Sequence, residues 1–551
     1  MWRRLIIGAL ILILIAGLGA WLNRKPLILF FVTNSGKVDI GPTQEVTWAQ
    51  GPVSAATPSN ERPPNIIFIL ADDLGMNDIS TFGGGVAGGR VPTPNIDRLA
   101  AGGAMFSQAY SGTGTCAPSR AMLMTGRYPT RTGFEFTPTP DGMGRIVAMF
   151  SNELIDDDVV PPVEWNRKQA KSNVPYEEKG LPSSEVTIAE TLKEAGYYTA
   201  HIGKWHLGRS EGFRPRDQGF DESLMMASGL FLPEGDPRGV DAKLPFDAID
   251  KFLWARMQFA ATFNDGAWFE PGGYLTDYWT DESLKVIEAN KNQPFFLYLA
   301  HWAPHTPLQA TKEDYDALEG IEPHRLRVYA SMIRAVDRSV GRIMDKLEEE
   351  GLAENTLIVF SSDNGGAGYI GIPEVNDPYR GWKITLFEGG IRVPMFLNWP
   401  AQIPAGAVID QPVAHIDVMP TLASAAGAPM PAGIAIDGKD MLPLATGEGP
   451  LERPDDAIFW SSGFYKVVRA GEWKLQVNEK QEEAWLFNLA EDPSEQVNLI
   501  SAAPEKRAEL QALIDAHWAN ARQPLYAHTL ESAIRIDKTN ADPFEAGDEY
   551  V

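Results

Sequence analysis

The chain has a single cysteine, Cys116, among its 551 residues, so no disulfide can form within it. Positive charge is also scarce: 48 Lys and Arg stand against 73 Asp and Glu, which gives a formal net charge of −25. A chain of this charge repels nucleic acid, and we exclude that class of partner. If the protein handles an anion, it must build a local positive pocket from a few Lys, Arg, His and metal sites.

Apolar runs of membrane-spanning length are rare as well. The stretch Leu5–Leu22 carries no charge and comes close to the ~20 residues that a membrane-spanning helix needs. It follows Met-Trp-Arg-Arg, as in a signal peptide, but the candidate cleavage region Leu18-Gly19-Ala20 places a bulky Leu where signal peptidase prefers a small residue. We therefore predict that residues 1–32 form an uncleaved membrane anchor and that the body is exported to the periplasm or the extracellular side.

The predicted body begins after a linker, residues 33–63, which is rich in Gly, Pro, Ser and Thr. Short apolar runs that read as buried strands then alternate with helical patterns. The runs are Asn65–Leu70, Tyr197–Ile202, Phe295–Leu299, Thr356–Phe360 and Met395–Leu397, and the clearest helical patterns are Thr187–Ala195 and Leu326–Glu350. This alternation predicts an α/β domain over residues 64–450, with a large, mostly parallel sheet.

Two smaller regions follow this domain. Over residues 451–523 we expect a small antiparallel sheet and one helix, from the runs Ala457–Trp460, Tyr465–Arg469, Lys474–Val477, Ala484–Asn488 and Pro504–Ala521. Residues 524–551 form a charged tail without a clear period. No internal repeat is found.

Two long stretches, 134–181 and 228–276, interrupt the α/β pattern and read as irregular. Loops of this length are usually functional or disordered. The second holds six aromatic residues, for which core packing is the favoured interpretation and a substrate-pocket wall or a membrane-facing surface the alternative: Phe252, Trp254, Phe259, Phe263, Trp268 and Phe269.

Acidic side chains follow two of the predicted strands where each strand ends. Asp72 and Asp73 come directly after the first strand, and Asp363 and Asn364 follow Thr356–Phe360. Ligands of open parallel sheets bind beyond the carboxyl ends of the strands. If these two strands are parallel neighbours, three carboxylates and an amide oxygen converge, which suits a hard divalent cation such as Ca²⁺ or Mg²⁺. Turn and cap roles are the alternative for either pair alone.

The lone cysteine begins the segment Cys116-Ala117-Pro118-Ser119-Arg120. Pro118 suits the first turn of a helix, which places Cys116 at a helix N-terminus, where backbone N–H groups favour an anion. Arg120 adds a planar positive group that matches oxygen ligands. A small buried apolar role is the alternative for a lone cysteine.

This segment, followed by Thr125-Gly126-Arg127, resembles the signature of the type I sulfatases of the alkaline phosphatase superfamily. The resemblance covers roughly residues 64–523 and implies an alkaline-phosphatase-like fold with helices on both sides of the sheet. It also implies that a formylglycine-generating enzyme converts Cys116 to formylglycine (3-oxoalanine) during export. The implied metal ligands are Asp72, Asp73, position 116, Asp363 and Asn364, with Ca²⁺ favoured and Mg²⁺ as the alternative.

Further segments match the same family. The resemblance assigns Lys204 and His206, in Gly203–Gly208, to the sulfate site, together with Lys383. Since Lys204 and His206 are two residues apart, we expect an extended segment to point both the same way. His305, in His301-Trp302-Ala303-Pro304-His305, matches the acid that faces the leaving group. We predict structural roles for His301, His415 and Asp417.

The implied reaction is hydrolysis of a sulfate ester by hydrated formylglycine at position 116, with His305 protonating the leaving oxygen and His206 taking the proton of the second hydroxyl. Two alternatives stay open: a formylglycine-dependent phosphonate or phosphodiester hydrolase, and a membrane-tethered binding protein without catalysis. The substrate alcohol is also open among carbohydrate, phenolic and sterol-like sulfates, and the oligomeric state is not predicted.

Overall fold

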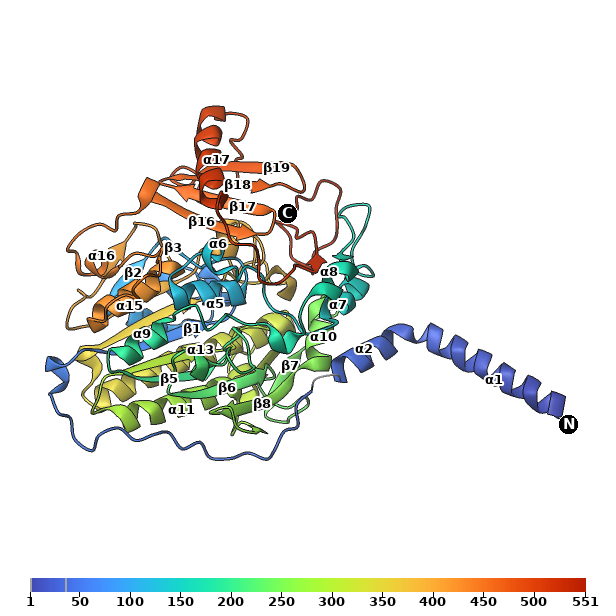
Figure 1. Ribbon diagram of the computed structural model, residues 1–551, viewed down its shortest axis with the longest axis horizontal. Coiled ribbons are helices and arrows are strands. Elements are labelled where there is room, and N and C mark those ends of the chain that lie inside the picture. The colour runs from blue at the N-terminus through green and yellow to red at the C-terminus, as the bar shows by residue number, and fades with distance from the viewer. Residues whose placement is uncertain (1, 35–36) are drawn as a thin grey trace.

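The structure is a computed structural model that describes residues 2–34 and 37–551. A ten-stranded sheet with helices on both faces forms the main body, and a four-stranded antiparallel sheet with one helix packs on it (Figure 1). The first of two N-terminal helices extends away from this body, and the second lies beside it. The predicted fold class is confirmed.

The large sheet is mixed, in the order β14-β2-β13-β12-β1-β10-β5-β6-β8-β9, with a parallel centre and with the edge strand β14 parallel to β2. Strands β12, β1, β10, β5 and β6 run parallel. Strand β13 pairs antiparallel with β12, β8 with β6, and β9 with β8. The bounds are β14 Ala407–Ile409, β2 Ala104–Phe106, β13 Met395–Asn398, β12 Thr356–Ser362, β1 Asn65–Ala71, β10 Phe295–Ala300, β5 Tyr198–Gly203, β6 Glu222–Ser228, β8 Gln258–Phe263 and β9 Trp268–Phe269.

Strand β1 is apolar on both faces because it separates two cores. Ile67 and Ile69 enter one core, and Ile66, Phe68 and Leu70 enter the other. The helices that close the first core are α4 (Pro94–Ala101), α11 (Leu275–Asn290) and α13 (His324–Glu349); those that close the second are α5 (Cys116–Thr125), α9 (Ile188–Glu194) and α15 (Val418–Ala426).

The C-terminal sheet agrees with its prediction. Its strands β16 (Ala457–Ser462), β17 (Tyr465–Ala470), β18 (Trp473–Asn478) and β19 (Glu483–Asn488) pair antiparallel in sequence order, and α17 (Pro504–Trp518) packs on them. A shared apolar cluster that includes Tyr110, Phe387, Trp460 and Trp485 joins this sheet to the main body.

The prediction of irregular structure over 228–276 is wrong. This stretch contributes β7 (Gly239–Ala242), α10 (Ala248–Arg256), β8 and β9, and the last two complete one edge of the large sheet. Edge strands of mixed composition lack the apolar run that marked the central strands. Four of the aromatic residues are buried: Phe252, Trp254, Phe259 and Phe269. Core packing is confirmed for Trp254, Phe259 and Phe269, whereas Phe252 also lines a cavity, as the alternative interpretation expected.

The other irregular stretch, 134–181, holds α7 (Met143–Ser151), β4 (Glu164–Trp165) and α8 (Arg167–Ser172). Strand β4 pairs antiparallel with β20 (Leu530–Glu531), which lies in the charged tail. Ile536 of the tail is fully buried in the cluster between the two sheets. The tail is thus tied to both the first irregular stretch and the body.

The N-terminal segment forms α1 (Trp2–Leu22) and α2 (Arg24–Asn34), and α2 packs against α7 and α10. No single helix within residues 2–34 and 37–551 has both the length and the hydropathy of a membrane span; Leu5–Gly19 and Arg24–Phe31 have them together, with a bend of 75° between them. The membrane anchor stays a prediction.

Candidate active site

The two acidic pairs meet at one edge of the large sheet. Strands β1 and β12 are parallel neighbours with Ala71 opposite Ser362, so the residues that follow them lie side by side. The Asp73 N–H donates to Asp363 Oδ1 at 3.2 Å, and Asn364 Nδ2 donates to Asp73 Oδ1 at 2.8 Å. The predicted convergence is present.

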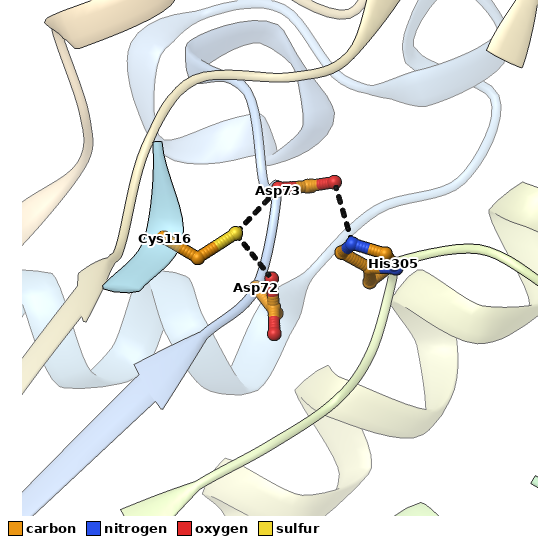
Figure 2. Close-up of side chains that lie close together, drawn as sticks. All are labelled: Asp72, Asp73, Cys116 and His305. Carbon is orange, nitrogen blue, oxygen red and sulfur yellow. Dashed lines mark hydrogen bonds and ion pairs between the residues drawn. The ribbon is translucent and has the colours of Figure 1, made fainter. Parts of the chain in front are cut away.

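Cys116 reaches the same edge from the start of α5, after the N-cap residue Thr115. Its Sγ lies 3.6 Å from Asp72 Oδ1 and 3.8 Å from Asp73 Oδ1 (Figure 2). Burial, together with the negative charge of Asp363, raises the pKa of the thiol above its usual range. The unmodified thiol therefore stays protonated in this arrangement.

Three fixed cations face the three carboxylates. Arg120 Nε lies 2.8 Å from Asp363 Oδ2, and Lys204 Nζ lies 2.6 Å from Asp72 Oδ2. Lys383 Nζ lies 2.6 Å from Asp73 Oδ1. These formal charges balance, but burial and the neighbouring Asp363 still raise the pKa of Asp72 to about 7.

The two predicted catalytic histidines lie on different elements around this cluster. His305 Nε2 is 3.6 Å from Asp73 Oδ2 (Figure 2), and its Nδ1 is 2.5 Å from the carbonyl oxygen of Thr306. Burial, with the charge of Lys383, lowers the pKa of His305 to about 3. His206 lines the same cavity as Cys116, and burial with the charge of Lys204 holds its pKa well below the usual range.

The extended-segment argument for Lys204 and His206 is wrong. Strand β5 ends at Gly203, and His206 has a left-handed backbone with φ of +64°. Side chains alternate only while the chain is extended. A turn beyond the strand, and not strand alternation, brings both side chains to the cavity.

The arrangement of oxygen atoms fits a divalent cation. One ligand atom each from Asp72, Asp73, Cys116 and His305 lie within 4.8 Å of one another. Asn364 Oδ1 is buried and accepts no hydrogen bond from any residue that the structure describes. A buried acceptor without a donor is costly, and a cation would satisfy it. Because carboxylate and amide oxygens predominate, a hard cation fits better than a soft one.

Two residues that the sequence did not single out contact the site. The Tyr369 hydroxyl donates to Asp73 Oδ2 at 3.0 Å and accepts from Lys383 Nζ at 3.2 Å. The Trp302 ring stacks on His305 with 4.0 Å between centroids, and Lys204 Nζ lies 4.6 Å from the Trp302 centroid. Trp302 sits inside a matched segment and could have been noticed, whereas no sequence signal marked Tyr369.

The residues assigned structural roles lie behind the site. His301 Nε2 is 2.9 Å from Ser339 Oγ of α13. His415 joins two site elements, since its Nδ1 is 3.1 Å from Ser119 Oγ and its Nε2 is 3.0 Å from Ser361 Oγ. Asp417 accepts the N–H groups of Ala414 and Lys439.

The site opens into a cavity of about 1140 Å³. Its catalytic end is lined by Cys116, Lys204, His206, His305 and Lys383. Its other walls come from α7, α10 and the tail over 526–551. The two stretches first read as irregular thus supply most of the wall that would contact a substrate alcohol.

Known proteins match this chain over most of its length. Residues 64–428 match the family described as Sulfatase, and residues 381–523 match the N-sulphoglucosamine sulphohydrolase C-terminal family. The N-acetylgalactosamine-6-sulfatase of Canis lupus familiaris is 33% identical over 422 residues, which cover 75% of this chain and 71% of that protein. The steryl-sulfatase of Homo sapiens is 32% identical over 477 residues, covering 74% and 73%.

Solved structures also match this chain in fold. The crystal structure of Ps i-CgsB in complex with k-i-k-neocarrahexaose has a TM-score of 0.69 and 32% identity, and covers 85% of this chain and 95% of that one. The phosphonate monoester hydrolase of Agrobacterium radiobacter, with a TM-score of 0.56 and 18% identity, covers 83% and 95% and shares the fold alone.

The chain belongs to the sulfatase family, as a type I sulfatase of the alkaline phosphatase superfamily. Its activity is the hydrolysis of sulfate esters.

Proposed function

We propose that Cys116 is oxidised to formylglycine by a formylglycine-generating enzyme and that the resulting side chain is the nucleophile. The observation that carries this proposal is the place of Cys116: buried, at the start of α5, within 3.8 Å of both Asp72 and Asp73. The hydrate of formylglycine supplies two hydroxyls on one carbon, one to attack sulfur and one whose proton is lost when sulfate leaves.

We propose that Asp72, Asp73, Asp363 and Asn364 hold a divalent cation, Ca²⁺ in preference to Mg²⁺, with the side chain at 116 as a further ligand. Such a cation supplies Lewis acidity at the nucleophile and at the sulfuryl oxygens. The unpartnered Asn364 Oδ1 supports this proposal. Because three carboxylates already balance three fixed cations, an added divalent cation makes the site net positive and suited to a sulfate ester anion.

The chain's own residues then have separable roles. Arg120, Lys204 and Lys383 neutralise charge on the sulfuryl oxygens. The Nδ1–H of His305 donates to the Thr306 carbonyl, so Nε2 is the nitrogen that faces the site. To act as the acid on the leaving oxygen, Nε2 must first take up a proton from solvent, a charge state that the nearby Asp73 carboxylate favours. His206, which lines the same cavity, takes the proton of the second hydroxyl.

Mass spectrometry tests the nucleophile. The tryptic peptide that spans Cys116 from active protein should carry an aldehyde or its hydrate in place of the thiol. The Cys116→Ser variant keeps one hydroxyl but lacks the second, so it should release at most one equivalent of 4-nitrophenol from 4-nitrophenyl sulfate and then stop. An intact thiol in fully active protein would overturn the proposal.

Sulfate esters of carbohydrates, sterols and phenols are the candidate substrates, since relatives are named for each. We propose that α1 and α2 anchor the protein in a membrane, with the catalytic body on the exported side, where the modifying enzyme also acts. The uncharged run Leu5–Leu22 supports the anchor. Flotation of the full chain with vesicles, before and after a carbonate wash, tests it: release by the wash would contradict an integral anchor.

A further inference from the structure

The helices α7 and α10 form part of the wall of the substrate cavity. Met143 and Val147 of α7 line it, as do Phe252 and Leu253 of α10. All four side chains are apolar, and they line the same cavity as the catalytic cations Lys204 and Lys383. A substrate that fills the cavity therefore presents its sulfate to charge and its alcohol to an apolar wall.

The outer side of the same wall is covered by the N-terminal segment. Ile28 of α2 packs against an apolar cluster whose buried members are Ile146, Phe252 and Leu253. Phe252 and Leu253 also line the cavity, so in places a single layer of side chains separates the cavity from α2. Figure 1 shows α2 beside α10, with α1 continuing away from the body.

Beyond this contact the segment is apolar and exposed. Leu14 of α1 is 71% exposed and Phe31 of α2 is 68% exposed. An apolar surface of this extent is unfavourable in water and marks a contact with a partner or a membrane. A bilayer is the occupant that fits, because the run Leu5–Leu22 carries no charge with which to recognise a polar partner.

We propose that the physiological substrate is the sulfate ester of a bulky apolar alcohol, dissolved in the membrane that α1 enters and reaching the cavity beside α7 and α10. The cavity of about 1140 Å³ is large enough for such an alcohol. This inference rests on the proposed sulfatase chemistry at Cys116 and adds the identity of the alcohol and its source.

Several cations of the cavity wall are already paired with carboxylates. Arg209 is paired with Glu177, Lys480 with Glu531 and Lys538 with Asp548. Paired cations add little to the binding of a second sulfate or a carboxylate, and Lys171 and Lys179 are lining cations for which the described residues form no ion pair.

The test uses the full, matured chain reconstituted in phosphatidylcholine vesicles with three substrates: cholesteryl sulfate, N-acetylgalactosamine 6-sulfate and 4-nitrophenyl sulfate. We expect kcat/KM for cholesteryl sulfate to exceed that for the sugar sulfate at least tenfold. We also expect cholesteryl sulfate in the enzyme's own bilayer to be hydrolysed at least tenfold faster than the same amount in separate vesicles.

The outcomes separate the two proposals. Preference for the sugar sulfate, with 4-nitrophenyl sulfate still hydrolysed, overturns the apolar alcohol and leaves the chemistry intact. Equal rates from shared and separate vesicles overturn delivery from the membrane. Loss of all three reactions overturns the sulfatase chemistry and the inference with it.

A pair of variants on α7 locates the alcohol. Val147→Phe fills part of the cavity beside α7 and should lower the ratio of kcat/KM for cholesteryl sulfate to that for 4-nitrophenyl sulfate at least tenfold. Arg145 is exposed and does not line the cavity, so Arg145→Phe should leave this ratio unchanged. A ratio that Val147→Phe does not change would place the alcohol elsewhere and contradict the inference.

Discussion

Two buried clusters of charged side chains can be compared in this protein. The catalytic cluster comprises Asp72, Asp73, Asp363, Arg120, Lys204 and Lys383. The second, which we call the intersheet cluster, joins the main body to the C-terminal sheet and comprises Glu388, Arg392, Arg469, Lys474 and Glu495. Both place carboxylates and cations away from water, yet only the catalytic cluster has members that line the cavity, namely Lys204 and Lys383.

The intersheet cluster is closed, because its carboxylates are fully bonded. Lys474 Nζ lies 2.9 Å from both Glu388 Oε1 and Glu495 Oε1. The Tyr110 hydroxyl donates to Glu388 Oε2 at 2.8 Å, and Glu495 Oε2 accepts the Glu388 N–H at 2.5 Å. Burial would raise the pKa of Glu388, but Lys474, Arg392 and Arg469 together outweigh it and lower the pKa to about 2. Glu495 has fewer cations beside it, and burial raises its pKa to about 7.

The catalytic cluster is open by contrast. Asn364 Oδ1 lacks a donor among the described residues, and Lys204 and Lys383 line the cavity. The two clusters thus contain the same kinds of charged side chain but have different roles, and the completeness of their hydrogen bonding distinguishes one cluster from the other. A saturated cluster fixes two sheets together, whereas an unsaturated one that a substrate can reach performs chemistry.

The largest effect should come from removing the nucleophile. Cys116→Ala should lower kcat for 4-nitrophenyl sulfate at least ~10⁴-fold, as expected when a residue that forms the covalent link is lost. Its free energy of unfolding should change by about 1 kcal/mol, because the side chain is small and makes only long contacts. Turnover rates and urea denaturation check both; substantial residual turnover would contradict the role of Cys116.

Removing a ligand of the proposed cation should lower kcat somewhat less than removing Cys116 does. Asp363→Asn keeps the volume but removes a charge that Arg120 and the proposed cation share. We expect kcat to fall ~10³-fold, in line with the loss of a major electrostatic contribution, and bound Ca²⁺ measured by elemental analysis to drop below one per chain. Wild-type metal content and turnover would remove Asp363 from the site.

The intersheet cluster should show the opposite pattern. Lys474→Met leaves Glu388 and Glu495 buried without their shared cation and should destabilise the fold by about 3–5 kcal/mol. Turnover per folded molecule should stay near wild type. Adding Glu388→Gln and Glu495→Gln in the same chain should restore part of the stability. A stable Lys474→Met protein would show that the cluster does not hold the sheets together.

The contact of Trp302 with two site residues should have an intermediate effect. Trp302 separates Lys204 from His305 and is held by a hydrogen bond from its Nε1 to the Gly229 carbonyl at 2.9 Å. Trp302→Leu should lower kcat/KM ~100-fold by misplacing both groups, whereas Trp302→Phe retains a ring and should lose much less. The pH profile of kcat/KM separates positioning from folding, since only misplacement of His305 shifts it.

The elements that the sequence predicted are those whose signal is local. A buried parallel strand is an apolar run, and the residues after β1 and β12 meet because the register of neighbouring strands is fixed, so Asp72, Asp73, Asp363 and Asn364 could be placed together. The start of α5 was similarly marked by Pro118. These rules need no knowledge of distant contacts.

What the sequence missed depends on contacts between distant segments. Tyr369 hydrogen-bonds to Asp73, which is 296 residues away in the sequence, and β4 pairs with β20 in the tail. The chain reversal that brings the His206 side chain to the cavity requires a left-handed backbone at His206 itself, and no glycine stands there to indicate it. Strands β8 and β9 were missed because β8 combines its apolar residues with Gln258 and Thr262 and β9 is only two residues long, so neither shows the apolar run of the central strands.

Asp78 is a buried carboxyl that belongs to neither cluster. Within the described part of the chain it forms no ion pair, so it shows the effect of burial on a carboxyl without a cation beside it. Its Oδ2 accepts from the Tyr329 hydroxyl at 2.6 Å and from the Gly75 N–H at 2.7 Å, while Oδ1 has no partner there. Burial raises the pKa of Asp78 to about 8 from the 3.8 of a solvated aspartate, so the folded protein holds a proton that the unfolded chain releases.

The sign of the pH effect follows from this difference. Because the folded pKa is the higher one, the stabilisation is complete below pH 3.8 and is lost as pH rises through about 8. Between pH 6 and 7 the free energy of unfolding should fall by about 1 kcal/mol. Asp78→Asn places an uncharged amide there and should make this slope shallower by about 1 kcal/mol per pH unit, while other carboxyls with a raised pKa, such as Asp72, keep their share. Urea denaturation at pH 5, 6, 7 and 8 would reveal the difference. An identical slope in both proteins would mean that Asp78 is ionised when buried, and that a buried carboxylate here needs no cation.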